Sequence, residues 1–333
     1  MKLNLRRILV AMLLGVCVYF VAALYSGVGK MRASLATYHF ETFLYACGLA
    51  FTNYCLRFLK WEFYLARLGI KGVKKWDSFL TFFSGFVLTV TPGKVGEVFK
   101  SYVLSETHGV PMPKTAPIVV AERATDVIGI VVLIILGSIG FGAGWEWAGI
   151  GTGLVLALLV VIANKRLSLG MIDMVGRLPG KFGAMKPKLE VAYENLAMML
   201  EPKNLVVPSL LSIAAWTCEC LSLWVILHGF GETTSIALCT FFYATSTLAG
   251  AVIPVPGGLG VTESSLLGQM RKFGEIGEGN AASAMILVRF ATLWFAVVNG
   301  FIALSILKKR NPGLLASPGV DRPAPDPQAE SQS

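Results

Sequence analysis

The sequence predicts an all-α polytopic membrane protein with about six spanning helices and two re-entrant helical hairpins in an inverted-topology repeat. Three observations support this fold class. Of the 333 residues, 55% are hydrophobic and only 15% are charged, whereas soluble domains carry about 25% charged residues. Several apolar runs approach the roughly 20 residues that a helix needs to cross the bilayer. Two shorter apolar segments end in clusters of proline and glycine.

Six apolar segments are expected to cross the membrane, at about 8–26, 41–65, 115–140, 144–163, 205–228 and 281–307. The first follows basic residues, as a signal peptide does, but no small-x-small cleavage site with a polar mature domain comes after it. We therefore expect a transmembrane helix there. The six cysteines lie in apolar stretches without the spacing of a zinc or redox motif. We predict no metal site and no cofactor.

The segments 77–91 and 236–253 are expected to turn back inside the membrane. The first would be only about 22 Å long as a helix. Proline removes a backbone donor and glycine permits a sharp reversal, and such backbone survives at membrane depth only inside protein or beside a wet cavity. The residues expected to break the two hairpins are Pro92, Gly93, Gly96, Pro254, Pro256, Gly257, Gly258 and Gly260.

The distribution of basic residues supports this topology. With both hairpins re-entrant, eighteen lysines and arginines between or beside the spans fall on the side of the two termini, against four on the other side. Basic loops stay in the cytoplasm, so both termini are expected to be cytoplasmic, at the inner membrane. The net charge of +9 is spread between apolar spans, which argues against a nucleic-acid partner.

The two hairpins begin similar units, about 77–140 and 236–307. A Thr-Phe-Phe sequence enters each hairpin, and a glutamate follows each break. Glu97 precedes Arg123 by 26 positions, and Glu263 precedes Arg289 by the same 26. Because one unit enters from the cytoplasm and the other from outside, they form an inverted repeat. Interrupted segments at matching positions of such repeats indicate a transporter binding site.

Charged residues inside the spans are the candidate site. Inserting one charged residue at the centre of a membrane helix costs roughly 2.5–3.5 kcal/mol. These residues, including Glu219 in the span 205–228, should therefore face the protein interior. Each arginine has two interpretations: an ion pair that locks a hairpin, or a guanidinium that grips an anionic head group. The two glutamates are either latches or proton-coupling groups. The candidate substrate residues are Glu97, Arg123, Asp126, Glu263, Arg289, Lys94 and Arg57.

Three other features complete the prediction. At the end of the second span, Lys60 and Trp61 are expected to reach the membrane interface, while the deeper Arg57 is a candidate for contacting a lipid phosphate. Residues 183–203 are expected to form an amphipathic cytoplasmic helix, either at the membrane interface or as a solvated connector. A transmembrane domain would span 1–310, and the polar, proline-rich tail 311–333 is expected to be disordered.

Several motifs together resemble the lysylphosphatidylglycerol synthase transmembrane-region family. They are Thr91–Glu97, Ala121–Asp126, Pro254–Glu263, Arg289 and the basic/Trp segment Leu56–Trp61, and the likeness extends over about residues 5–308. Lys60 stands where the family more often has arginine. In the bacterial multiple peptide resistance factor, a domain of this type flips aminoacylated phospholipid beside a soluble transferase domain, which we expect this chain to lack. The resemblance implies lipid flipping without lysyl transfer, and stand-alone members are associated with hopanoids or polyprenyl-linked sugars.

The sequence thus favours a transporter that moves a polar-headed lipid (phospholipid, hopanoid or polyprenyl-linked) between leaflets, and not an enzyme. Two alternatives remain. One is a membrane transferase that uses a lipid-linked donor, with Glu97 or Asp126 as its carboxylate. The other is a non-catalytic accessory subunit of a lipid-synthesis complex. The expected partner is the lipid substrate, with a homo-oligomer or a lipid-biosynthesis protein as further possibilities.

Overall fold

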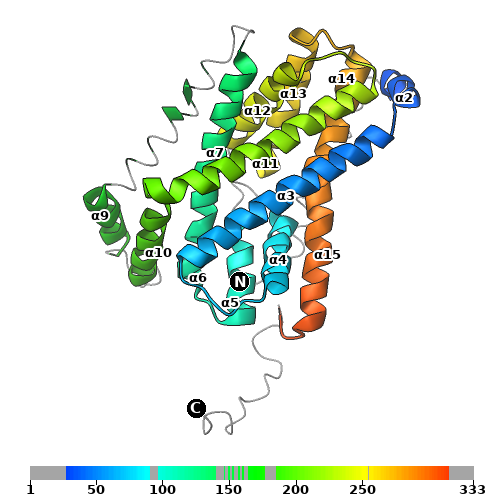
Figure 1. Ribbon diagram of the computed structural model, residues 1–333. Helices are drawn as coiled ribbons and strands as arrows, with labels where there is room; N and C mark the ends of the chain where they lie inside the picture. The colour runs from blue at the N-terminus through cyan, green and yellow to red at the C-terminus, as the bar shows by residue number, and fades with distance from the viewer. Residues whose placement is uncertain are drawn as a thin grey trace.

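The computed structural model describes residues 28–90, 97–139, 164–176, 185–253 and 255–314, with isolated positions between 146 and 160. Within these ranges all the regular elements are helices and none is a strand. Figure 1 shows them packed side by side, with two long helices running diagonally across the molecule. This confirms the all-helical class.

The two diagonal helices, α3 (Glu41–Arg67) and α11 (Pro202–Gly229), run antiparallel and pack against each other along their length (Figure 1). Small residues at the contact, among them the buried Ala46 and Ala215, let the backbones approach closely. Asn53 Nδ2 donates to the carbonyl of Ala215 at 2.7 Å, and Ser222 Oγ donates to that of Ala46 at 3.2 Å. These bonds satisfy polar groups inside an apolar pair.

In the first predicted hairpin, which we call hairpin 1, the structure describes two helical limbs on either side of residues 91–96. Its first limb is α4 (Lys75–Ser84), continued by the 3₁₀ turn η1 (Gly85–Leu88), and its second limb is α5 (Phe99–His108). The two limbs pack against each other. Pro92, Gly93, Lys94 and Gly96, which were predicted to lie in the break, fall outside the described residues. The short helix α6 (Met112–Thr115) then leads into α7 (Pro117–Ser138).

The second predicted hairpin, hairpin 2, has the same form. Its limbs are α12 (Ile236–Val252) and α13 (Val261–Lys272), joined through the 3₁₀ turn η4 (Pro256–Gly258). Gly257, Gly258 and Gly260 have φ of 61°, 69° and 84°, which L side chains rarely adopt. The chain turns at these three glycines, between the two limbs, while Pro254 lies outside the described residues. α14 (Glu278–Arg289), the π-helical turn η5 (Phe290–Trp294) and α15 (Phe295–Arg310) follow as one continuous helix.

The hairpins lie toward opposite ends of the molecule, and each leans on the other unit's long helix (Figure 1). α4 and η1 pack on α15, where an added Cβ at Gly300 would lie 2.6 Å from the nitrogen of Val87. α12 packs on α7, where an added Cβ at Gly137 would lie 2.7 Å from the nitrogen of Phe241. Glycine at each contact lets hairpin and helix backbones touch. The two units are therefore interlocked.

Four of the six predicted spans coincide with α3, α7, α11 and the helix α14–α15. The span 8–26 and most of 144–163 lie outside the described residues. By length and apolar composition, two helices of the described chain qualify to cross a membrane: Pro202–Gly229 and Glu278–Arg310. α3 and α7 are also long, with 27 and 22 residues, but they carry several charged side chains in their interiors.

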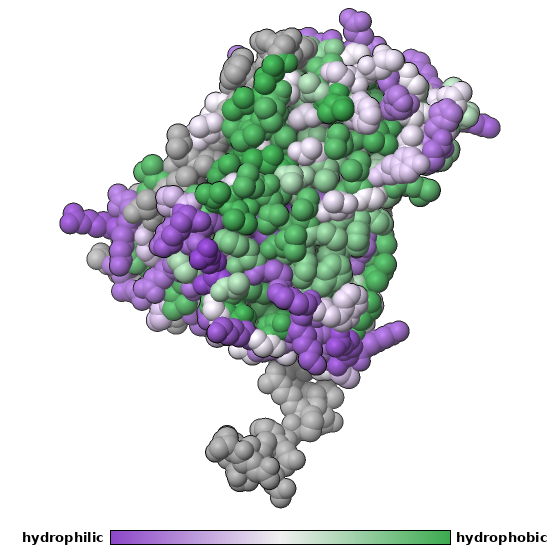
Figure 2. All heavy atoms as spheres, in the orientation of Figure 1, coloured by the Kyte–Doolittle hydropathy of each residue, from purple (hydrophilic) through white to green (hydrophobic). Residues whose placement is uncertain are grey.

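The outer surface agrees with a membrane setting. Figure 2 shows hydrophobic residues over the middle of this face and hydrophilic residues toward both ends. Exposed apolar side chains of the two long helices include Leu44, Phe51 and Leu59 of α3 and Val206 and Leu210 of α11. Monomeric soluble proteins rarely expose a continuous apolar area of this extent, whereas hydrocarbon tails cover it at no cost.

The segment predicted to be a cytoplasmic helix and the start of the tail differ in detail from the prediction. The expected amphipathic helix corresponds to α10 (Lys186–Met199), which packs on α6, α7 and α9 (Lys165–Gly176). Its apolar side therefore covers the protein core, where Met199 is fully buried. A short helix, α2 (Val28–Ala36), packs on α14 and was not predicted. The chain stays packed just past the predicted end of the domain, since Leu314 is buried; residues 315–333 lie outside the described range.

Candidate functional site: a charged cavity between the hairpins

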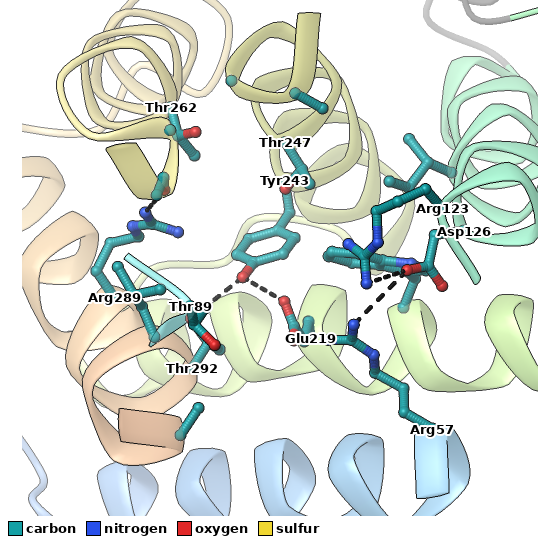
Figure 3. Close-up of a pocket in the computed structure, with 18 of the residues that line it drawn as sticks. Arg57, Thr89, Arg123, Asp126, Glu219, Tyr243, Thr247, Thr262, Arg289 and Thr292 are labelled. Atoms are coloured by element: carbon teal, nitrogen blue, oxygen red, sulfur yellow. Dashed lines mark hydrogen bonds and ion pairs between the residues drawn. The ribbon is translucent and has the colours of Figure 1, made fainter. Parts of the chain in front are cut away.

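A central cavity of about 110 Å³ lies where the two hairpins meet the long helices. It has room for several water molecules. Both hairpins, α3, α7, α11 and the helix α14–α15 contribute to its wall. The close-up in Figure 3 shows polar side chains converging on it. The polar and aromatic residues of its wall include Arg57, Arg123, Asp126, Trp216, Glu219, Tyr243, Arg289 and Thr292.

On the hairpin 1 side, Arg123 of α7 is the central cation. Its Nη2 lies 3.0 Å from Glu97 at the start of the returning limb and 3.0 Å from Asp126, one turn further along α7. Arg57 of α3 approaches the same two carboxylates, at 3.7 Å from Glu97 and 3.8 Å from Asp126. The prediction that Arg123 pairs with a hairpin carboxylate is confirmed.

Lys60 lies beneath this group and is fully buried. Its Nζ donates to Asp126 Oδ1 at 2.6 Å and to Ser212 Oγ of α11 at 2.8 Å. The expectation that Lys60 and Trp61 reach the membrane interface is wrong, since neither side chain is exposed. The physical reason is that one face of α3 packs against hairpin 1, α7 and α11, and Lys60 and Trp61 lie on that buried face. The Lys60 ammonium contacts one oxygen of the Asp126 carboxylate. A lysine can make such a single contact as well as the arginine that the family more often has there.

A second ion pair lies behind the cavity wall. Lys100 of α5 donates to Glu122 of α7 at 2.5 Å, and both side chains are buried. The Lys100 ammonium also lies 4.7 Å from the ring centre of Trp61 and 4.9 Å from that of Phe82. These cation–π contacts partly replace the water that the charge has lost.

On the hairpin 2 side, Arg289 of α14 pairs with Glu263 of α13. Arg289 Nε donates to Glu263 Oε1 at 2.6 Å, and Nη2 donates to the carbonyl of Gly257 at 3.0 Å. The other oxygen of Glu263 accepts from the nitrogen of Gly260 at 2.7 Å and so caps α13. One carboxylate therefore fixes the glycine turn, the start of the helix and the arginine.

Between the two arginine clusters, Glu219 of α11 faces a group of hydroxyls (Figure 3). Tyr243 of α12 donates to Glu219 Oε2 at 2.7 Å and lies 3.2 Å from the hydroxyl of Thr292. Tyr54 of α3 donates to the carbonyl of Thr292 at 2.5 Å. Sequence reasoning located Glu219 in mid-span without assigning it to the site, and it missed both tyrosines. Nothing in the pattern separates these tyrosines from ordinary core aromatics.

The structure brings most of the predicted site residues together. Arg57, Arg123, Asp126 and Arg289 line the cavity, together with Gly257 and Gly258. Glu97 and Glu263 lie behind the arginines as ion-pair partners and are not among the lining residues. Lys94 lies outside the described residues.

The cavity wall suits an anionic group. Three arginines and two carboxylates, Asp126 and Glu219, line it. The indole nitrogen of Trp216 on the same wall has no hydrogen-bond acceptor among the described residues. The arginine N–H groups and this indole N–H can donate to phosphate or carboxylate oxygens, while Glu97 and Glu263 balance the arginine charges from behind. In the described part of the chain, no three His, Cys, Asp or Glu side chains lie close enough to hold a metal ion.

Comparison with known proteins agrees with this architecture. The chain matches the model of the family described as lysylphosphatidylglycerol synthase TM region over residues 8–300. It belongs to that family and is therefore a membrane protein.

Archaeal relatives match most of the chain. A UPF0104 membrane protein of Methanocaldococcus jannaschii is 21% identical over 93% of this chain and 97% of its own length. A second from the same organism is 24% identical over 67% of this chain and 95% of its own length. A UPF0104 membrane protein of Methanothermobacter thermautotrophicus is 23% identical over 63% of this chain and 68% of its own length.

Proposed function

We propose that this protein is a lipid translocase, which moves a polar-headed lipid between the two leaflets of the membrane. The arginine-lined cavity between the two hairpins is the observation that carries the proposal. Buried charges inside membrane helices are costly and usually mark a substrate pathway. The head group would pass through the cavity, while the hydrocarbon chains remain in the bilayer.

The proposed topology follows from the same features. Both hairpins would be re-entrant, with hairpin 1 entering from the cytoplasm and hairpin 2 from the opposite side. Their breaks would then meet near the middle of the bilayer, where broken helices expose backbone donors to a ligand. Both termini would lie in the cytoplasm, at the inner membrane of the cell.

The alternative of a lipid-linked transferase needs a carboxylate that is free to act as a base. Asp126 contacts Lys60 and Arg123 and lies near Arg57, and Glu97 pairs with Arg123. Carboxylates held by cations are weak bases, so the geometry favours transport over transfer. Conversion of a radiolabelled lipid precursor by the purified protein, lost in Glu97→Gln, would support the transferase instead.

Reconstitution in liposomes tests the proposal. The purified protein should move lipids from a panel of phosphate-bearing and uncharged head groups between leaflets, as measured by chemical quenching of labelled lipid. Arg123→Gln should slow movement of the anionic members by at least about tenfold, the loss expected when one hydrogen bond to a charged group disappears. Arg271→Gln is the control, because Arg271 is half exposed at the far end of α13. If the wild-type protein moves no member of the panel, the proposal fails.

A further inference from the structure

The two units can be compared position by position. Adding 166 to a residue number of the first unit converts Glu97 to Glu263 and Arg123 to Arg289. The structure supports this register, because both pairs form ion pairs, at 3.0 Å in the first unit and 2.6 Å in the second. Each pair ties the returning limb of a hairpin to the helix that follows it. We call these two ion pairs the latches.

The same register shows where the units differ. The buried Lys100–Glu122 pair of the first unit corresponds to Leu266 and Val288 in the second, both fully buried. Asp126, which gathers Lys60 and Arg123 in the first unit, corresponds to the neutral Thr292. The second unit therefore keeps the latch but has apolar or neutral residues at the positions of the other charges.

Hairpin 1 is held by charged residues at its foot and at its returning limb. At its foot, Asp77 pairs with Arg310 of α15 at 2.6 Å, and Glu62 of α3 accepts from both Lys75 and Ser78. At its returning limb, the Lys100–Glu122 pair reinforces the latch. Moving the returning limb would separate two ion pairs, Glu97–Arg123 and Lys100–Glu122, whose carboxylates are buried. Leaving a buried charge unpaired is strongly unfavourable, whereas the exposed pairs at the foot contribute little.

Hairpin 2 is constructed differently. Glu263 is the only charged residue between Ile236 and Met270. Its first limb meets α7 through an apolar contact at Gly137. Apolar surfaces slide past one another without losing directional bonds. The polar contacts between this hairpin and other helices include the latch, the Tyr243 bonds to Glu219 and Thr292, and the exposed Arg271–Glu278 pair. Of these contacts, only the latch joins two buried charges.

Hairpin 2 is also held together internally. Gln269 of α13 accepts from Thr245 at 2.9 Å and donates to Ser246 at 3.0 Å, and both partners lie on α12. The limbs touch closely at Gly250, where an added Cβ would lie 2.1 Å from the hydroxyl of Thr262. The hairpin can therefore move as one body.

We propose that hairpin 2 is the moving gate of the cavity and that hairpin 1 is its fixed wall, with the Glu263–Arg289 latch holding the gate closed. This inference rests on the proposed transport function, which requires a passage wider than the present cavity of about 110 Å³. Arg289 lines the cavity, so an anionic head group competes with Glu263 for it. Capture of the head group thereby weakens the latch and opens the gate.

Chemical accessibility tests the gate. Val127 of α7 lines the cavity and carries the reporter, Val127→Cys, in a full-length chain whose native cysteines are replaced. In membrane vesicles, a charged methanethiosulfonate reagent should modify the cysteine introduced at position 127. When Glu263→Gln is added, this modification should be at least about tenfold faster than in the protein that carries the reporter alone, the shift expected for losing one charge-assisted hydrogen bond. The matched Glu97→Gln should stay within about twofold, because Lys100–Glu122 still holds hairpin 1. Equal acceleration in the two variants would overturn the gate.

Exchanging the anchors provides a reciprocal test. Lys100→Leu with Glu122→Val gives hairpin 1 the apolar contact of hairpin 2, and such replacements of buried ion pairs usually preserve folding. This variant should admit the reagent from the side at which hairpin 1 enters, which the parent does not. Leu266→Lys with Val288→Glu should hold the gate closed and lower both the modification rate and lipid movement. An unchanged pattern in the first variant contradicts the proposal.

Hydrogen exchange of the unmodified protein adds a measurement that needs no variant. The backbone amides of α13 should exchange at least about tenfold faster than those of α5, since local opening follows the weaker attachment. Equal protection of the two limbs would overturn the proposal. If the wild-type protein moves no lipid but the accessibility difference persists, the transport function fails and the gate stands. If lipid moves and the two latch variants react alike, the gate fails and the function stands.

Discussion

Replacing Lys60 tests whether the buried charges form one network. The Nζ atom donates to Asp126 at 2.6 Å and Ser212 at 2.8 Å, with Thr125 at 3.3 Å, so helices α3, α7 and α11 meet at a single ammonium. In Lys60→Met the methionine fills a similar volume without the charge. Asp126 then loses its shortest ion pair.

The magnitude follows from the partners that remain. Breaking a buried ion pair by removing one member costs roughly 3–5 kcal/mol. Arg123 at 3.0 Å and Arg57 at 3.8 Å still face Asp126 after the change. We therefore expect the lower end of the range, a loss of about 3 kcal/mol in the free energy of unfolding. Lys60→Arg should lose less, because it keeps the charge but must fit a larger group into a site without exposed surface.

Unfolding in mixed micelles by titration with dodecyl sulfate, followed by tryptophan fluorescence, measures this loss. The control is Lys75→Met, because the Lys75 side chain is 82% exposed although it also pairs with a carboxylate. Exposed pairs contribute little, so the control should unfold at the parent concentration. If Lys60→Met is no less stable than Lys75→Met, the idea that Lys60 joins three helices is refuted.

Three further substitutions probe the close contacts and the cavity. Gly300→Ala should destabilise the protein by about 1–3 kcal/mol, because its Cβ overlaps the backbone of hairpin 1; Gly48→Ala, whose Cβ meets nothing within 4 Å, should not lower the melting temperature. Gly258→Ala, at φ 69°, should cost about 1–3 kcal/mol of left-handed strain, visible in the same melting experiment. Tyr243→Phe removes the donor to Glu219 and should cost about 1–3 kcal/mol while slowing lipid movement; the exposed Tyr45→Phe should change neither.

The latches were predictable from spacing because both of their members are charged. Charged side chains in apolar spans must find partners, and an equal separation of 26 positions in two units points to an equivalent pair. The clusters of proline and glycine indicated where the breaks lie, and Gly257 and Gly258 adopt backbone angles that other residues avoid. Side-chain charge and the backbone freedom of glycine are properties of single residues, so the sequence alone indicates them.

The position of Lys60 was not predictable in this way. A basic residue near the end of an apolar helix ordinarily reaches the membrane surface. Lys60 is buried because α11 and α7 cover that part of α3, a contact between segments far apart in the chain. The hydroxyls around Glu219 were missed for a related reason. Tyr54 and Tyr243 lie on different helices, and only their packing brings both to Thr292.

The interlocked arrangement explains why one cavity serves two repeats. The first limb of each hairpin packs on the long helix of the other unit, while its returning limb is latched to the helix of its own unit. A hairpin that moves therefore changes its contacts with both units at once, and the cavity between them cannot open on one side without disturbing the other. An equal pair of latches would give equal resistance to opening from either side. The first unit has Lys100 and Glu122 where the second unit has Leu266 and Val288, so the two resistances differ. In the gate proposal, the unit that carries the additional charges therefore determines the side on which the cavity opens.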